Sequence, residues 1–184
     1  MLFFYSYISL YNNIIGSNNA AFGYGALYNN TTSNNSAFGY RALFANTIGT
    51  DNTAVGRSAL QTNTTGSYNT AVGRTALYSN TIGTNNTAVH VNSMYYNTSG
   101  GSNTSIGVSS LNRNVNGNYN TAIGTAALYY NTTGSLNTAN GYLGLYLNTI
   151  GSANTANGYQ AMYYNVEGSY NAANGYFALG LNNN

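Results

Sequence analysis

The residues that could carry acid–base chemistry are few in this chain of 184 residues, which has one histidine (His90), one aspartate (Asp51), one glutamate (Glu167) and no cysteine. A general acid or base must lie within about 3 Å of the group with which it exchanges a proton. If the chain folds as the stacked coils inferred below, His90 lies about two coils from Asp51 and more than about four from Glu167, which is too far. We therefore predict that the chain is not an enzyme and has no catalytic residue, no cofactor and no metal site of its own. Only a metal held by His90 side chains of neighbouring subunits is left open.

Tyrosine is the more suggestive residue type, because the chain has 20 tyrosines at regular spacing. One interpretation is an aromatic strip that offers a surface to sugars or to a partner protein. The other interpretation is that the rings stack along the molecule and close contacts between subunits. The residues assigned to a candidate surface contact are Tyr78, Tyr95, Tyr129, Tyr146 and Tyr163.

Charged residues make up only 3% of the chain, and the net charge is +2. Four arginines spread along the sequence cannot neutralise a run of phosphates, so we expect no basic patch and no nucleic-acid partner. Residues 1–16 are apolar and aromatic, but they lack the basic start and the cleavage site of a signal peptide and are too short to span a membrane. We therefore expect no membrane insertion.

The elements that must position these side chains follow from a 17-residue repeat. The unit that begins at Asn19 is one residue shorter than the others, and residues 2–18 form a degenerate extra unit. We divide the chain into residues 1–18, a degenerate first repeat and candidate cap, and residues 19–184, a tandem array. The first position of the regular units is an asparagine, at Asn35, Asn52, Asn69, Asn86, Asn103, Asn120, Asn137, Asn154 and Asn171.

Two positions of the repeat predict structural ladders. The ninth position is leucine in most units, which predicts a continuous apolar ladder. The twelfth position is asparagine, and a stack of amides can donate to one neighbouring coil and accept from the other. The leucine ladder is Leu27, Leu43, Leu60, Leu77, Leu111, Leu128, Leu145 and Leu179, with Met94 and Met162 in the same position. The asparagine ladder includes Asn63, Asn80, Asn97, Asn114, Asn131 and Asn148 and continues to Asn182.

The residue types favour strands over helices. Glycine at the fifth and fifteenth positions would cost about 1 kcal/mol each in a helix. Threonine, valine, isoleucine and tyrosine favour strands, whereas asparagine and glycine favour the bends between them. We predict an all-β fold, a parallel β-solenoid or β-roll of about ten coils, with two short strands per coil near Thr70–Val72 and Ala76–Tyr78 and their equivalents.

The apolar residues of these segments predict self-assembly. Apolar residues stand side by side, as Ala71 does beside Val72 and Leu77 beside Ala76, and adjacent strand residues point to opposite faces. A thin coil has only one interior, so we expect the second face to contact another chain.

The repeat pattern also runs to both ends of the sequence, which predicts open strand edges there. We expect rods to join end to end through these edges. The residues expected to be buried at the junction are Phe3, Phe4, Tyr5 and Tyr7.

The motif Asn69-Thr70-Ala71-Val72-Gly73, followed by Ala76 and Leu77, resembles the head repeats of YadA-like trimeric autotransporter adhesins, and similar arrays occur in phage tail fibres. The resemblance covers nearly the whole chain. It implies a left-handed parallel β-roll, association of three chains, and display of a binding surface outside the cell. The unit here is longer than the usual head repeat, and no stalk or membrane barrel is evident, so a membrane anchor is not implied. The fourth position changes from valine or isoleucine to asparagine from Asn140 onward, which argues against a uniform interface along the rod.

These observations support three classes of function. The first is a non-enzymatic extracellular fibre or adhesin segment at a cell surface, a homo-oligomer assembled as a trimer or an end-to-end filament, with a host surface or a glycan as its candidate ligand. The alternative is a phage or viral tail fibre, located on the virion. The third is ice binding, suggested by threonine at the second and thirteenth positions of the repeat. Ice binding requires a flat rank of threonines at strand spacing, whereas these columns adjoin bends and bulky tyrosines.

Overall fold

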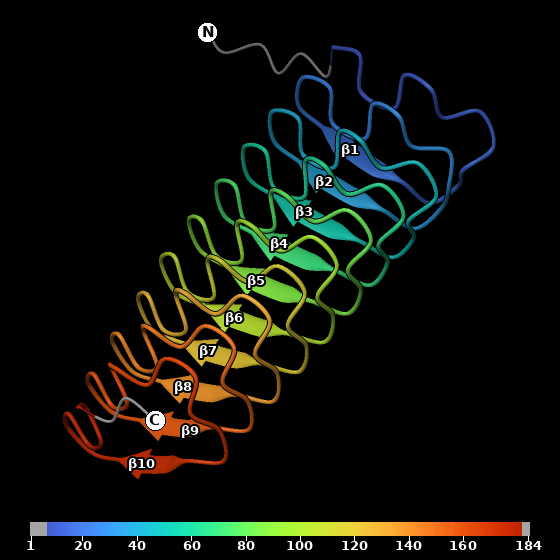
Figure 1. Ribbon diagram of the computed structural model, residues 1–184. Coiled ribbons are helices and arrows are strands. Elements are labelled where there is room, and N and C mark those ends of the chain that lie inside the picture. Colours follow the sequence, from blue (N-terminus) through green and yellow to red (C-terminus); the bar gives the residue numbers. More distant parts are fainter. Residues whose placement is uncertain (1–6, 182–184) are drawn as a thin grey trace, which may run out of the picture.

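A computed structural model describes residues 7–181 as a single rod of stacked coils (Figure 1). Each coil from Asn19 onward contributes one short strand, and the described residues contain no helix. The predicted all-β parallel solenoid with 17-residue coils is therefore confirmed. The predictions that concern Phe3, Phe4, Tyr5 and Asn182 fall outside the described residues.

Ten strands form one parallel sheet along the side of the rod, in chain order. The register places each position of the repeat beside its own equivalent, since Thr70 pairs with Thr87 and Ala71 with Ala88 in the next coil. Nine steps of about 4.8 Å give the sheet a length of about 43 Å. The strands are β1 (Ala20–Phe22), β2 (Ser36–Phe38), β3 (Thr53–Val55), β4 (Thr70–Val72), β5 (Thr87–Val89), β6 (Thr104–Ile106), β7 (Thr121–Ile123), β8 (Thr138–Asn140), β9 (Thr155–Asn157) and β10 (Ala172–Asn174).

The core of the rod is made of small and medium-sized apolar side chains. Ala71 in β4 points inward, and Ala76 and Leu77 from the opposite side of the coil complete the same layer, all of them fully buried. The leucine ladder is fully buried from Leu27 to Leu145, together with Met94 and Met162. Leu179 differs, because it lies in the last described coil and is 48% exposed. Each coil thus covers the apolar layer of the coil before it.

The second strand predicted at Ala76–Tyr78 is wrong. This segment is a series of turns, with Thr75 at φ 58° and Leu77 at φ 51°, both in the left-handed region. An extended strand would point Ala76 and Leu77 to opposite faces, whereas the left-handed turn brings both side chains inside. The segment still bonds to its neighbours, because the Leu77 N–H donates to the carbonyl of Ser93 in the next coil at 3.0 Å.

The left-handed leucine is unfavourable for the backbone and favourable for packing. An L-residue in this conformation costs about 1–2 kcal/mol, while full burial of a leucine side chain contributes about 1.5–3 kcal/mol. Burial therefore compensates for the backbone cost. Because Ala76 and Leu77 both point inward, this segment has no apolar face directed outward. The expectation of two apolar faces therefore applies only to the strands.

Two ladders of buried asparagines run beside the apolar core. In the twelfth position, Asn80 Nδ2 donates to Asn63 Oδ1 at 2.7 Å, and Asn80 Oδ1 accepts from Asn97 Nδ2 at 2.8 Å. In the first position, the Asn69 side chain donates to the carbonyl of Gly83 at 2.8 Å. The same pattern of amide-to-amide bonds recurs at Asn114, Asn131 and Asn148. These bonds satisfy polar groups that would otherwise be costly in a dry core.

Glycine at the fifth position of the repeat allows the coils to approach closely. Gly73 has a φ of 137°, and a Cβ added there would lie 2.5 Å from the carbonyl oxygen of the next corner residue, His90. His90 occupies the same corner with a φ of 110°. L side chains rarely adopt that conformation. The corner therefore selects glycine on two grounds, and His90 is a strained exception.

Candidate binding surface

The three candidate acid–base residues do not come together. His90 lies at the corner after β5, where its Nδ1 accepts a hydrogen bond from the Val91 N–H at 3.0 Å. Asp51 and Glu167 lie in other coils, at the seventeenth and fourteenth positions of their units. Within residues 7–181, no three His, Cys, Asp or Glu side chains are grouped as a metal site would need. The same residues include no helix of sufficient length and apolarity to cross a membrane.

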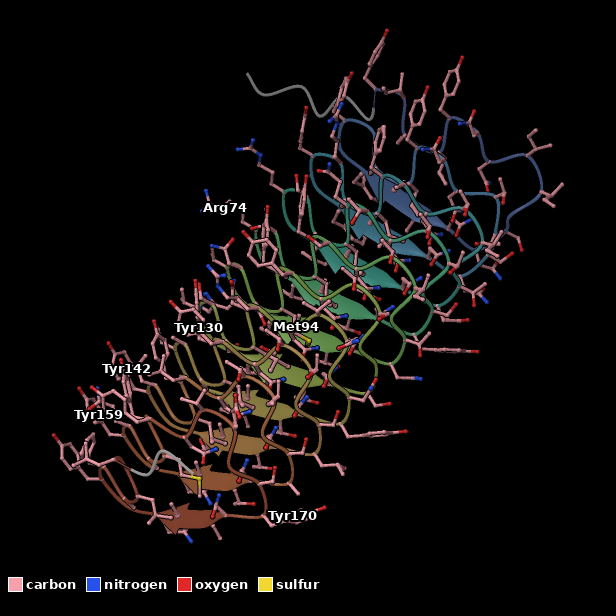
Figure 2. The ribbon with its side chains drawn as sticks, viewed as in Figure 1. Arg74, Met94, Tyr130, Tyr142, Tyr159 and Tyr170 are labelled. Atoms are coloured by element: carbon pink, nitrogen blue, oxygen red, sulfur yellow. The ribbon has the colours of Figure 1, made fainter. Side chains whose placement is uncertain are left out.

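The tyrosines of the tenth position stack along one side of the rod. The ring centroids of Tyr78 and Tyr95 are 5.0 Å apart with nearly parallel planes, and those of Tyr146 and Tyr163 are 5.2 Å apart. These rings are half-buried. Figure 2 shows Arg74, Tyr130, Tyr142 and Tyr159 projecting from this side, where the carboxyl ends of the strands point, and Tyr170 on the opposite side. Ring-on-ring packing is therefore one role of the strip.

Stacking also changes the ionisation of the phenols. Burial raises the pKa of Tyr95 above its usual value, with smaller contributions from Tyr78 and Tyr96. Burial likewise raises the pKa of Tyr146 and of Tyr163, again with contributions from neighbouring tyrosines. The neutral phenol is the form that this packed side of the rod favours.

The expectation of no basic patch is wrong. Arg41, Arg57 and Arg74 line one hollow of about 410 Å³. Arg57 and Arg74 occupy the sixth position of their units and Arg41 the seventh, so the three side chains project from consecutive coils at nearly the same place. This signal was present in the sequence, but arginines that look scattered along a chain become neighbours once the coils stack.

The fourth arginine extends the same surface. Arg113 lines an adjoining hollow of about 210 Å³, which shares Asn92 and Tyr95 with the first. The guanidinium carbon of Arg113 lies 5.2 Å from the centre of the Tyr130 ring, and that of Arg41 lies 5.0 Å from the Phe44 ring. We call the two hollows together the arginine groove.

The sheet presents a different surface. Along each strand the middle residue points inward, so the residues at the second and fourth positions of the repeat face outward, as Thr70 and Val72 do in β4. Val72 is 37% exposed and Ile106 in β6 is 41% exposed. The hydroxyl groups of the second-position threonines make no hydrogen bond within the described chain. Those of the thirteenth position do, since Thr81 Oγ1 donates to the carbonyl of Thr98 at 3.0 Å.

No protein-family model matches the chain, and neither a curated protein nor a solved structure does. Two surfaces of the rod could bind a partner, namely the outer face of the sheet and the arginine groove.

Proposed function

We propose that this chain is a non-enzymatic structural rod, a fibre or adhesin segment that works outside the cell and associates side by side with two further copies of itself. The observation that supports it is an apolar strip on the exposed face of the sheet. The strip follows the fourth position of the repeat from β1 to β7, namely Phe22, Phe38, Val55, Val72, Val89, Ile106 and Ile123.

The strip has the dimensions of a contact surface. Seven strands at about 4.8 Å give it a length of about 29 Å. Apolar side chains in one continuous row on a regular sheet are unusual on the surface of a monomer and mark association sites. Burying them against equivalent strips removes that surface from water, which is the main favourable term in association.

The strip ends where the sequence changes. In β8, β9 and β10 the fourth position is asparagine, and Asn157 Nδ2 donates to Asn174 Oδ1 at 2.8 Å. The close contact between chains is therefore confined to β1–β7, and the last three coils stay apart. A left-handed coil and a three-chain assembly, both implied by the resemblance to adhesin heads, belong to this proposal. A phage or viral tail fibre is the alternative setting for the same assembly.

Paired charge substitutions test the side-by-side contact. Val72→Glu with Ile106→Glu places two carboxylates in the apolar strip, and Asn140→Glu with Asn157→Glu places two carboxylates in the same column outside it. The unmodified chain and the asparagine variant should have a light-scattering mass of three times 19.4 kDa, and the strip variant should have the mass of one chain. A monomeric unmodified chain, or a strip variant that keeps its mass with an unchanged circular dichroism spectrum, would overturn the proposal.

Ice binding is a second candidate, because the second-position threonines form an outward-facing rank on a regular sheet with free hydroxyl groups. The thirteenth-position threonines do not contribute, since their hydroxyls are engaged between coils. Thermal hysteresis of the purified protein, lost in Thr70→Tyr with Thr104→Tyr, would support this role. An unchanged freezing point for the unmodified protein would exclude it.

A further inference from the structure

The arginine groove concentrates all of the arginine charge of the chain in one place. The sequence has only four lysines and arginines in total, and all four line the two adjoining hollows. Three come from consecutive coils, and Arg113 comes from the second coil after them. In the sixth position of other coils stand uncharged residues such as Tyr24, Val91 and Val108, so the fold itself does not require arginine here.

No carboxylate of the described residues balances these charges. Within the described residues, no guanidinium group pairs with a carboxylate or donates a hydrogen bond to another residue. The Nε of Arg41 is buried and has no hydrogen-bond partner. Like charges on neighbouring strands or coils repel one another, and a buried donor without a partner is unfavourable. An anion in the groove would relieve the repulsion between the guanidinium groups.

The aromatic stack is interrupted at the groove. In the tenth position, Gln61 and Asn112 replace aromatic residues. Asn112 lies between Tyr95 and Tyr129 in this column, so these two rings do not stack on each other. Both tyrosines line the second hollow together with Arg113. Arg113 lies at this interruption, with its guanidinium carbon 6.0 Å from the centre of the Tyr129 ring.

The remaining lining residues are neutral and polar. Gln61 Nε2 lies 3.5 Å from the hydroxyl of Tyr78, and Thr75 Oγ1 donates to Asn92 Oδ1 at 2.6 Å. Amides and hydroxyls both donate and accept, which suits the hydroxyl groups of a sugar. The first hollow has a volume of about 410 Å³. That volume lies within the usual range for a ligand site.

We propose that the arginine groove binds an acidic polysaccharide lying along the rod, with its sulfate or carboxylate groups on the guanidinium groups and its sugar rings against Tyr95 and Tyr129. Guanidinium groups bind planar or tetrahedral oxyanions through paired N–H donors. The proposal deepens the adhesion part of the proposed function and rests on it, but it does not require side-by-side assembly. A nucleic acid would use the same charges, but the neutral amides and hydroxyls of the groove favour a sugar chain.

The test compares two variants with the same net charge. Arg57→Gln with Arg74→Gln removes two charges from the groove. Tyr68→Asp with Tyr119→Asp adds two negative charges in the column of Asp51, where φ is positive in all three residues and aspartate is tolerated. Both variants lower the formal net charge from +2 to 0. Binding is measured by surface plasmon resonance to dextran sulfate, polygalacturonate, neutral dextran and single-stranded DNA, with inorganic sulfate as competitor.

The expected result is binding to dextran sulfate, polygalacturonate or both, with none to neutral dextran, and weakened by salt. The choice between the two polymers identifies sulfate or carboxylate as the recognised group. The groove variant should lose about tenfold or more in affinity and the control variant less than about threefold. Three results would overturn the proposal. Equal losses of affinity in both variants would mean that net charge alone is responsible. Tighter binding to DNA would make the groove a nucleic-acid site, and binding of inorganic sulfate without either polymer would make it a small-anion site. The light-scattering mass of each variant shows separately whether the assembly persists.

Discussion

Replacing Asn80 by leucine tests whether the buried asparagine ladder stabilises the rod. Leucine has the same branching as asparagine, so the substitution keeps the shape of the side chain and removes its hydrogen bonds. Asn63 Oδ1 would lose the donor that it now has at 2.7 Å, and one N–H of Asn97 Nδ2 would lose its acceptor at 2.8 Å. Gly83 would keep a partner, because Asn69 Nδ2 also donates to its carbonyl, at 2.8 Å.

The cost follows from these two unpaired groups. Each buried polar group left without a partner costs about 1–3 kcal/mol, so the free energy of unfolding should fall by about 2–6 kcal/mol. In a domain of this size 1 kcal/mol corresponds to about 2–4 °C in melting temperature, which predicts a decrease of at least about 4 °C.

Thermal melting followed by circular dichroism measures the effect of Asn80→Leu. Asn116→Leu is the matched control, because Asn116 is exposed and its side chain makes no hydrogen bond in the described structure. The control should change stability by less than about 0.5 kcal/mol. A melting temperature of Asn80→Leu equal to that of the control would show that the ladder contributes nothing and refute the reasoning.

Three further predictions address the leucine ladder, the corner and the tyrosines. Leu77→Asn places an amide in the fully buried ninth column and should cost about 3–5 kcal/mol, measured by urea unfolding; an unchanged midpoint would mean that the column is wet. His90→Gly should raise stability by about 1 kcal/mol, because glycine adopts positive φ without strain. Gly73→Ala should lower stability, because the added Cβ would lie too close to the carbonyl oxygen of His90. A lower melting temperature for His90→Gly, or a higher one for Gly73→Ala, would contradict this explanation of the corner. The raised pKa of Tyr95, Tyr146 and Tyr163 contributes stability that is fully present below the unfolded value of about 10 and is lost as the pH rises through the folded values. The melting temperature should therefore fall as the pH rises above about 10, and it should fall less in the triple phenylalanine variant.

The repeat made the strand side of the coil predictable. Parallel pairing in register follows once identical residues recur at a fixed spacing, and the small Ala71 between Thr70 and Val72 indicates which residue points inward. The leucine and asparagine columns could be found in the same way, because a position that repeats its residue type in every coil must meet the same surroundings in every coil.

The opposite side of the coil could not be predicted from residue preferences. Leucine and threonine rarely adopt positive φ, so the residue types at Leu77 and Thr75 do not indicate left-handed turns. The packing of the whole coil imposes that conformation. The arginine groove could have been predicted from the sequence. Arg57 and Arg74 are one repeat apart, and this spacing places them in neighbouring coils. Applying the repeat to the charged residues, and not only to the apolar ones, would have found it.

Electron microscopy of the purified, unmodified protein tests the central claim most directly. If the rod is a structural segment that associates through the apolar strip of β1–β7, micrographs should show rods packed side by side in threes, in contact along part of their length and separate at the end that holds β8–β10. Single thin rods at every concentration, one chain wide, would contradict the claim.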